Sequence, residues 1–142
     1  MTDAEIDALE AGSELDKMVA DACGIVVDYD PKTYGPIKVC RYVDGENLAA
    51  FSPSRWWNDA MLALDKIVGT DDSFVADSVS MNCDYRGWQV DLLKTIEWND
   101  GDETNGWEDT PRCVATLASE SDDSGPIAIC RAILKAVKNA ST

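Results

Sequence analysis

The segment MNCDYRGWQVDLLKT, from Met81 to Thr95, has the pattern of a β-hairpin. Its centre, Asp84-Tyr-Arg-Gly87, is polar and ends in glycine, which is typical of a tight turn between antiparallel strands. Beyond the turn, mainly apolar side chains alternate with mainly polar ones, as in a strand with one buried face. The first set comprises Trp88, Val90, Leu92 and Lys94, and the second comprises Gln89, Asp91, Leu93 and Thr95.

Strand-like sequence continues on both sides of this hairpin. We predict strands from Phe74 to Cys83 and from Arg112 to Ala118, which with the central strand make a three-strand antiparallel meander. A further strand is predicted from Ile37 to Val43.

Three helices are predicted around the strands. The first begins at Ser13, an N-cap residue, and ends at Gly24; the second has Ser52 as N-cap and Pro53 in its first position. The third runs from Pro126 to Asn139, with Arg131, Lys135 and Lys138 expected on its outer side. The fold class that follows is α+β, an antiparallel sheet covered by three main helices as a helix–sheet–helix sandwich.

The chain of 142 residues is predicted to form one domain, 1–142, with 1–12 as an N-terminal extension that could attach loosely. Its core is expected to contain Leu64, Val90, Ile133 and Leu134, together with Trp56 or Trp57. The two tryptophans lie about 100° apart on a helix, so one of them could instead mark a contact surface.

Acidic residues dominate the composition. There are 27 Asp and Glu against 12 Lys and Arg, a net charge of −15. From Val68 to Asp123, fourteen acidic residues face three basic ones, Arg86, Lys94 and Arg112. Such a field repels nucleic acid and anionic membranes and attracts basic surfaces, although acidity can also serve solubility alone. We expect no direct nucleic-acid binding, no membrane span and, given the acidic N-terminus, a location in the cytoplasm.

The sequence lacks the residues of most catalytic sites. It contains no histidine, no nucleophile elbow and no phosphate-binding glycine loop, and its many carboxylates single out no acid–base pair. We therefore expect no enzyme activity and no cofactor. The five cysteines form no C-x-x-C pair, so we expect reduced, mostly buried thiols and no metal.

The segment from Trp98 to Pro111 is polar, acidic and rich in turn residues, which predicts a surface loop. Asp100-x-Asp102 resembles the opening of a calcium loop, but Gly106 is one position late and Pro111 replaces the final glutamate, so only loose cation binding stays open. Trp98 and Trp107 bracket the loop and could either fold back on the sheet edge or act as exposed anchors. The predicted partner-binding residues are Trp98, Asp100, Asp102, Glu103, Trp107, Glu108 and Asp109.

Three stretches resemble the phage ABA-sandwich domain, a family of small phage and prophage proteins. They are SELDKMVADACG (13–24), FSPSRWWNDA (51–60) and GPIAICRAILKAV (125–137), of which the last is the most specific. The resemblance implies a helix–sheet–helix arrangement and brings no catalytic residue, cofactor or substrate.

Charge and resemblance together suggest a non-catalytic phage protein in the host cytoplasm. The expected function is inhibition of a host antiviral defence, in the manner of an anti-CRISPR protein whose acidic surface mimics nucleic acid and occupies a basic site. The expected partner is a basic host protein, a defence nuclease or its complex. Two alternatives stay open: a sponge for a small immune-signalling nucleotide, and a structural or assembly component of the virion.

Overall fold

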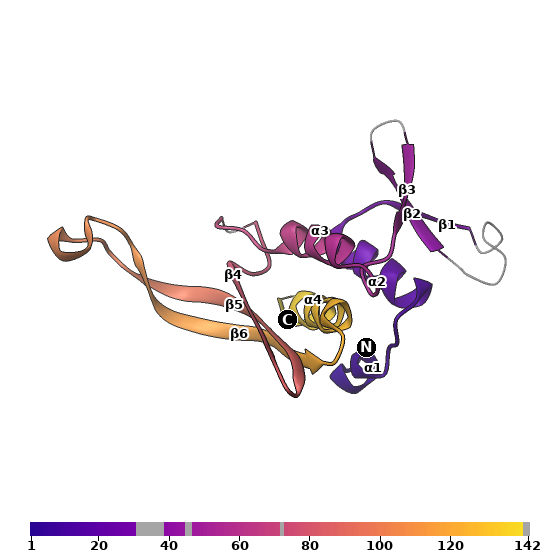
Figure 1. Ribbon diagram of the computed structural model, residues 1–142. Helices are drawn as coiled ribbons and strands as arrows, with labels where there is room; N and C mark the ends of the chain where they lie inside the picture. Colours follow the sequence, from indigo (N-terminus) through magenta and orange to yellow (C-terminus); the bar gives the residue numbers. More distant parts are fainter. Residues whose placement is uncertain (31–38, 45–46, 72, 141–142) are drawn as a thin grey trace.

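The computed structural model of the protein describes residues 1–30, 39–44, 47–71 and 73–140 (Figure 1). Its elements, in chain order, are α1 (Asp3–Asp7), α2 (Ser13–Cys23), β1 (Val27–Asp30), β2 (Val39–Asp44), β3 (Asn47–Phe51), α3 (Trp57–Ile67), β4 (Ser78–Asp84), β5 (Gly87–Asn99), the 3-10 turn η1 (Glu103–Asn105), β6 (Thr110–Asp122) and α4 (Gly125–Ala140). The predicted α+β class is therefore confirmed.

The three-strand meander is confirmed as the antiparallel sheet β4-β5-β6. Tyr85 and Arg86 form the turn between β4 and β5, and Asp84 pairs with Gly87. Gly87 has φ of 115°, and a Cβ there would lie 2.7 Å from the backbone oxygen of Asp122. Glycine is required here because other residues rarely adopt this conformation and have no space for a side chain.

Strand β6 is longer than predicted. It extends to Asp122, so the predicted end at Ala118 is wrong. Its alternation explains the error: Ala118 and Glu120 are buried, whereas Ser119 and Ser121 are exposed. One polar face makes a solvated strand resemble a loop in composition.

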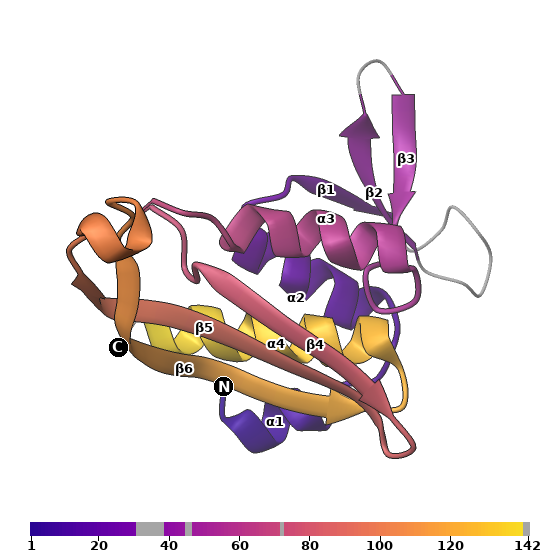
Figure 2. The same ribbon diagram turned by 60° about the vertical axis from the view of Figure 1, so that its left-hand side comes forward.

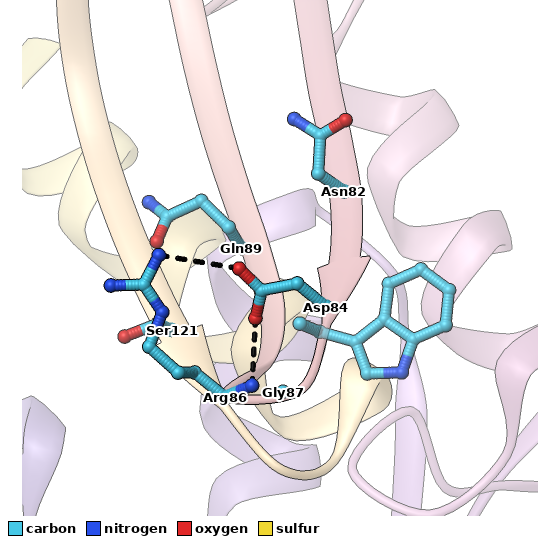
Figure 3. Close-up of a pocket in the computed structure, with 7 residues that line it drawn as sticks. Asn82, Asp84, Arg86, Gly87, Gln89 and Ser121 are labelled. Carbon is cyan, nitrogen blue, oxygen red and sulfur yellow. Dashed lines mark hydrogen bonds and ion pairs between the residues drawn. The ribbon is translucent and has the colours of Figure 1, made fainter.

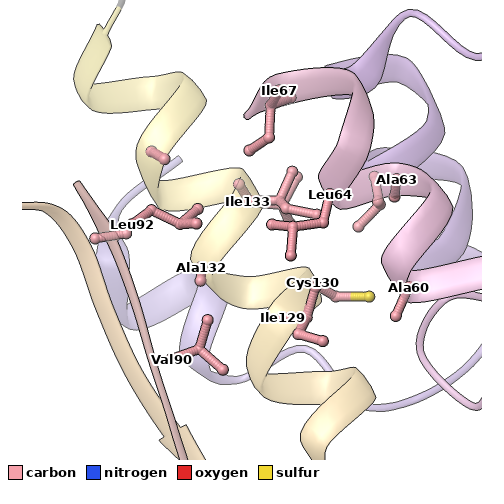
Figure 4. Packing of buried hydrophobic residues seen from close by; sticks show 14 of the residues in the cluster. Ala60, Ala63, Leu64, Ile67, Val90, Leu92, Ile129, Cys130, Ala132 and Ile133 are labelled. Atoms are coloured by element: carbon pink, nitrogen blue, oxygen red, sulfur yellow. The ribbon is translucent and has the colours of Figure 1, made fainter. Parts of the chain in front are cut away.

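Helix α4 forms the centre of the core. It lies between strand β5 and helix α3, as Figure 4 shows with Val90 and Leu92 on one side and Leu64 on the other. Val90 and Ile133 are 0% exposed, Leu64 is 2% and Leu134 is 9%, as predicted.

The prediction that Trp56 or Trp57 lies in this core is wrong. Trp56 is 50% exposed and Trp57 is 40% exposed. The rings of Trp57 and Trp88 make a T-shaped contact with centroids 4.8 Å apart, and the Trp57 ring covers Gly125. A tryptophan ring is too large for the space between α3 and α4, which is filled by alanine and aliphatic side chains.

The predicted start of α3 is also wrong. The helix begins at Trp57, and residues 53–55 form a turn before it. The hydroxyl of Ser52 donates to Asp16 Oδ2 at 2.9 Å, so it does not cap α3. Likewise Ser13 is the first residue of α2, and Gly12 takes the N-cap position without a side-chain hydrogen bond.

Two basic residues of α4 point inward, contrary to the prediction that they lie outside. Arg131 donates to the carbonyl oxygen of Leu9 and to Asp122, and its side chain is 13% exposed. Lys135, 9% exposed, contacts Asp7 and Glu120. Lys138, the outermost of the three, pairs with Asp3. These contacts, with Ile6 at 1% exposure, join the first helix to α4.

The further strand corresponds to β2, and Ile37 lies outside the described residues. It is the middle strand of a second antiparallel sheet, β1-β2-β3, whose outer strands were not predicted. Among the described helices, none combines the length and the apolarity that a membrane crossing requires.

Candidate functional site: an acidic arm

Strands β5 and β6 continue well beyond the end of β4 and form a two-stranded arm that projects from the helical body (Figure 1). We define the arm as residues 94–115 and its tip as residues 100–109. Pairing with β4 stops at Leu93, whereas pairing with β6 continues to Asn99, which faces Thr110. The described strands along the arm therefore number two, whereas the part of the sheet that packs on α4 has three.

All seven predicted site residues lie on this arm and are exposed. Trp98 is 53% exposed and Trp107 is 70% exposed, so neither folds back into a covered position. Trp98 belongs to strand β5 and pairs with Pro111, so the connecting loop is shorter than predicted. The five carboxylates belong to the loop proper: Asp100, Asp102, Glu103, Glu108 and Asp109.

The tip has a defined conformation that its own polar groups maintain. The backbone N–H of Gly101 donates to Asp109 Oδ1 at 3.0 Å, and that of Thr104 donates to Asp102 Oδ1 at 2.8 Å. The backbone of Trp107 donates to the carbonyl oxygen of Asp102 at 2.8 Å. A Cβ on Gly101 would lie 2.2 Å from the Trp107 carbonyl, so the two loop segments meet at a glycine.

Trp107 itself has φ of 66°, which is unusual for a bulky residue. Such a backbone costs about 1–3 kcal/mol, and residues of this kind concentrate at functional sites. The strained backbone presents an indole ring to solvent. The tip thus combines an exposed aromatic side chain with five exposed carboxylates, a composition suited to contact with a protein surface.

No basic residue occurs in the sequence between Thr95 and Pro111, so the tip itself contributes five carboxylates and no cation. Further apolar side chains are exposed at the base of the arm, where Ile96 is 61% and Val114 46% exposed. Thr70, Asp77, Ser78, Leu93, Thr95, Trp98 and Val114 line a hollow of about 210 Å³ at this position.

A second hollow, of about 330 Å³, lies on the sheet beside the β4–β5 turn (Figure 3). Asp84 accepts from the backbone and the guanidinium of Arg86, at 2.7 and 3.3 Å. Asn82, Gln89 and Ser121 complete its polar wall. The lining carries one cation and one anion that neutralise each other.

Two buried polar clusters were missed by sequence reasoning. In the first, Asp16 is 2% exposed and accepts from the Ser52 hydroxyl and the Ser54 backbone. Burial raises the pKa of Asp16, while its hydrogen bonds to Ser54 and Ser52 act against that rise. The cluster fastens α2 to the turn before α3.

The second cluster is Asp7, Glu120 and Lys135. Burial lowers the pKa of Lys135, but hydrogen bonds to both carboxyls outweigh it and raise the pKa overall. The hydrogen bond from Lys135 lowers the pKa of Asp7, whereas burial raises that of Glu120. A carboxyl pair with opposed pKa shifts can be an acid–base pair, but neither residue lines either hollow. We interpret the cluster as a structural connection of α1, β6 and α4.

The cysteines and carboxylates of the described part form no group of three or more that could hold a metal ion. Cys23, Cys83 and Cys130 are free thiols, and the side chains of Cys40 and Cys113 lie outside the described residues. Burial raises the pKa of Cys23 to about 12 and that of Cys130 well above its ordinary value.

Comparison with protein-family models, with curated proteins and with solved structures finds no match.

Proposed function

We propose that the protein is a non-catalytic binding protein that docks on a positively charged partner through the acidic arm. The observation that carries this proposal is the concentration of exposed carboxylates and two exposed tryptophans on an arm that stands clear of the body. The carboxylates attract and orient the partner, and the indole rings supply apolar contact area once the surfaces meet.

The biological setting of the proposal comes from the resemblance to the phage ABA-sandwich domain. We propose a phage-encoded inhibitor of a host antiviral defence, acting like an anti-CRISPR protein in the host cytoplasm. The basic partner would be a defence nuclease or its complex. Exposed carboxylates on a narrow arm can occupy a channel that otherwise takes the phosphate backbone.

The alternatives gain less from the structure. A nucleotide sponge needs several cations around one pocket, but Arg86 is the only basic residue in the two hollows of the sheet, and it pairs with Asp84. A virion component would use broad contacts between copies, which a charge of −15 opposes.

The test is a variant in which Asp100, Asp102 and Asp109 become Asn while Glu103 and Glu108 become Gln. Asparagine keeps an oxygen acceptor for the hydrogen bonds at 102 and 109, so the tip should keep its conformation. Captured partners are first identified from host lysate at low and high salt, and association rates are then measured for each. The variant should associate more slowly and with a weaker dependence on salt.

The matched control removes five exposed carboxylates from the body: Glu10, Glu14, Asp21, Asp65 and Asp123. It changes the net charge equally and leaves the arm intact, so it should retain most of the association rate. Equal slowing by both variants would mean that only total charge matters, and the proposal for the arm would be wrong. For the mimicry itself, the unmodified protein should compete with DNA for the captured partner.

A further inference from the structure

Along the arm the sheet consists of β5 and β6 alone, whereas nearer the β4–β5 turn β4 is the third strand. Strand β4 pairs with β5 only as far as Leu93, and among the described residues no strand continues along that edge of β5 beyond Thr95 (Figure 2). At the point where β4 leaves the sheet, Asp77 takes over its hydrogen bonds. The Asp77 N–H donates to the Leu93 oxygen at 2.9 Å, and its carboxylate accepts from the Thr95 N–H at 2.8 Å. The edge is thus occupied as far as Thr95, and no strand of the described part of the chain pairs with it farther toward the tip.

The hollow of about 210 Å³ lies beside this edge, where β4 begins. Its walls include Leu93, Trp98 and Val114 from β5 and β6, with Asp77 and Ser78 at the edge where the strand would enter. Trp98 and Val114 are 53% and 46% exposed, so the hollow has apolar walls open to solvent. A strand with an apolar residue at one position would bury part of these walls.

The negative charge around this edge would favour a basic segment as the added strand and disfavour an acidic one. The tip carries five carboxylates, and no basic residue follows Lys94 until Arg112. An acidic segment or a second copy of this chain, with its charge of −15, would be repelled. Basic side chains flanking the apolar residue would face the tip carboxylates.

From these observations we infer that the arm binds an extended segment of its partner as an additional β-strand, with lysine or arginine flanking an apolar residue that enters the Trp98–Val114 hollow. This inference rests on the proposed function and states how the acidic arm recognises its partner. Main-chain hydrogen bonds would supply affinity, and the hollow and the charges would supply specificity.

The experiment uses the full chain and two synthetic peptides. The first is acetyl-Lys-Val-Lys-Val-Lys-Val-Lys-amide, and the second has the same side chains with its internal amides N-methylated. Both carry the same charge, but only the first can pair as a strand. We expect the first to bind at least about tenfold more tightly by calorimetry. It should also slow hydrogen exchange of the β5 amides beyond Thr95.

Two substitutions separate the hollow from general aromatic exposure. Trp98→Ala removes one wall and should weaken the first peptide several-fold. Tyr85→Ala, at the far turn of β5 where the ring is 93% exposed, should leave its affinity unchanged. Circular dichroism confirms folding, and the exchange measurement on the unmodified protein does not depend on either variant.

The outcomes separate this inference from the proposed function. If both peptides bind equally and the five-carboxylate tip variant weakens both, the acidic arm is the docking surface but strand addition is wrong. If the tip variant binds both peptides as tightly as the unmodified protein does, the proposed function itself fails, and the partner chemistry assigned here fails with it.

Discussion

Replacing Lys135 with methionine should remove more stability than any charge change on the surface. Lys135 Nζ lies 2.6 Å from Asp7 Oδ1 and 2.6 Å from Glu120 Oε2. Its side chain is 11% exposed and that of Glu120 is 7%, whereas Asp7 is 48% exposed and can be hydrated without its partner. The substitution therefore leaves one buried carboxylate, Glu120, without a counter-charge.

Removing one partner of a buried ion pair typically costs about 3–5 kcal/mol. We expect a loss of that size in the free energy of unfolding, measured by urea denaturation followed by circular dichroism near pH 7. Lys17→Met is the matched control, because Lys17 pairs with Asp21 in an exposed i,i+4 bridge at 3.0 Å with side chains 49% and 63% exposed. That bridge should contribute only about 0.3–0.5 kcal/mol.

The cause of the loss can be checked by restoring neutrality. In Lys135→Met/Glu120→Leu the buried charge is absent, so most of the lost stability should return. Lowering the pH should also restore stability to the single variant Lys135→Met, because protonation neutralises Glu120. Burial raises the pKa of Glu120, so its unfavourable contribution grows as the pH rises through that pKa and disappears below the ordinary carboxyl range of about 4. If Lys135→Met lost under about 1 kcal/mol, or if the double variant were no more stable than the single one, the cluster would not be the connection argued here.

Four further predictions concern the fold and the cysteines. Leu134→Ala should lower stability by about 2–5 kcal/mol, whereas Val26→Ala, at a position 87% exposed, should change it by under about 0.5 kcal/mol in the same denaturation assay. Gly87→Ala should cost about 1–3 kcal/mol because of its φ of 115° and the Asp122 backbone, while Gly12→Ala, with no atom within 4 Å of the added carbon, should cost less. Alkylation of the native protein, mapped by mass spectrometry, should modify the exposed Cys83 before Cys23 and Cys130. Because burial raises the pKa of Cys23 to about 12, the stability due to this thiol should decline from about pH 8.5 upward, and Cys23→Ala should remove that decline.

Local pattern predicted the meander and the last helix well. The Asp84–Gly87 turn, the burial of Val90 and Leu92, and the apolar face of α4 follow from periods of two and of 3.6 residues, which are short-range properties. The acidic tip was also found from composition, because a segment with five carboxylates, two glycines and no cation has few apolar groups to bury.

Helix starts were less predictable. Ser52-Pro53 has the residues of a helix N-terminus, but the hydroxyl of Ser52 is held by Asp16, which is 36 positions away. That tertiary hydrogen bond replaced the cap, and the helix began at Trp57. No local sequence pattern predicts such a distant partner. The free energy gained from capping is small compared with the cost of leaving a buried carboxylate without its hydrogen bond.

The sequence alone determined the α+β class, the central hairpin and the sign of the surface charge, because each depends on neighbouring residues or on composition. Only the tertiary structure decided that β5 and β6 extend past the region paired with β4 and form an arm. It also decided that the side chains of Arg131 and Lys135 point inward. Arg131 reaches the carbonyl of Leu9 across 122 positions, and β4 begins at Ser78, directly after Asp77, whose carboxylate accepts the next edge hydrogen bond of β5 from Thr95. Contacts of that range arise from the packing of the whole chain, which periodicity along the sequence does not contain.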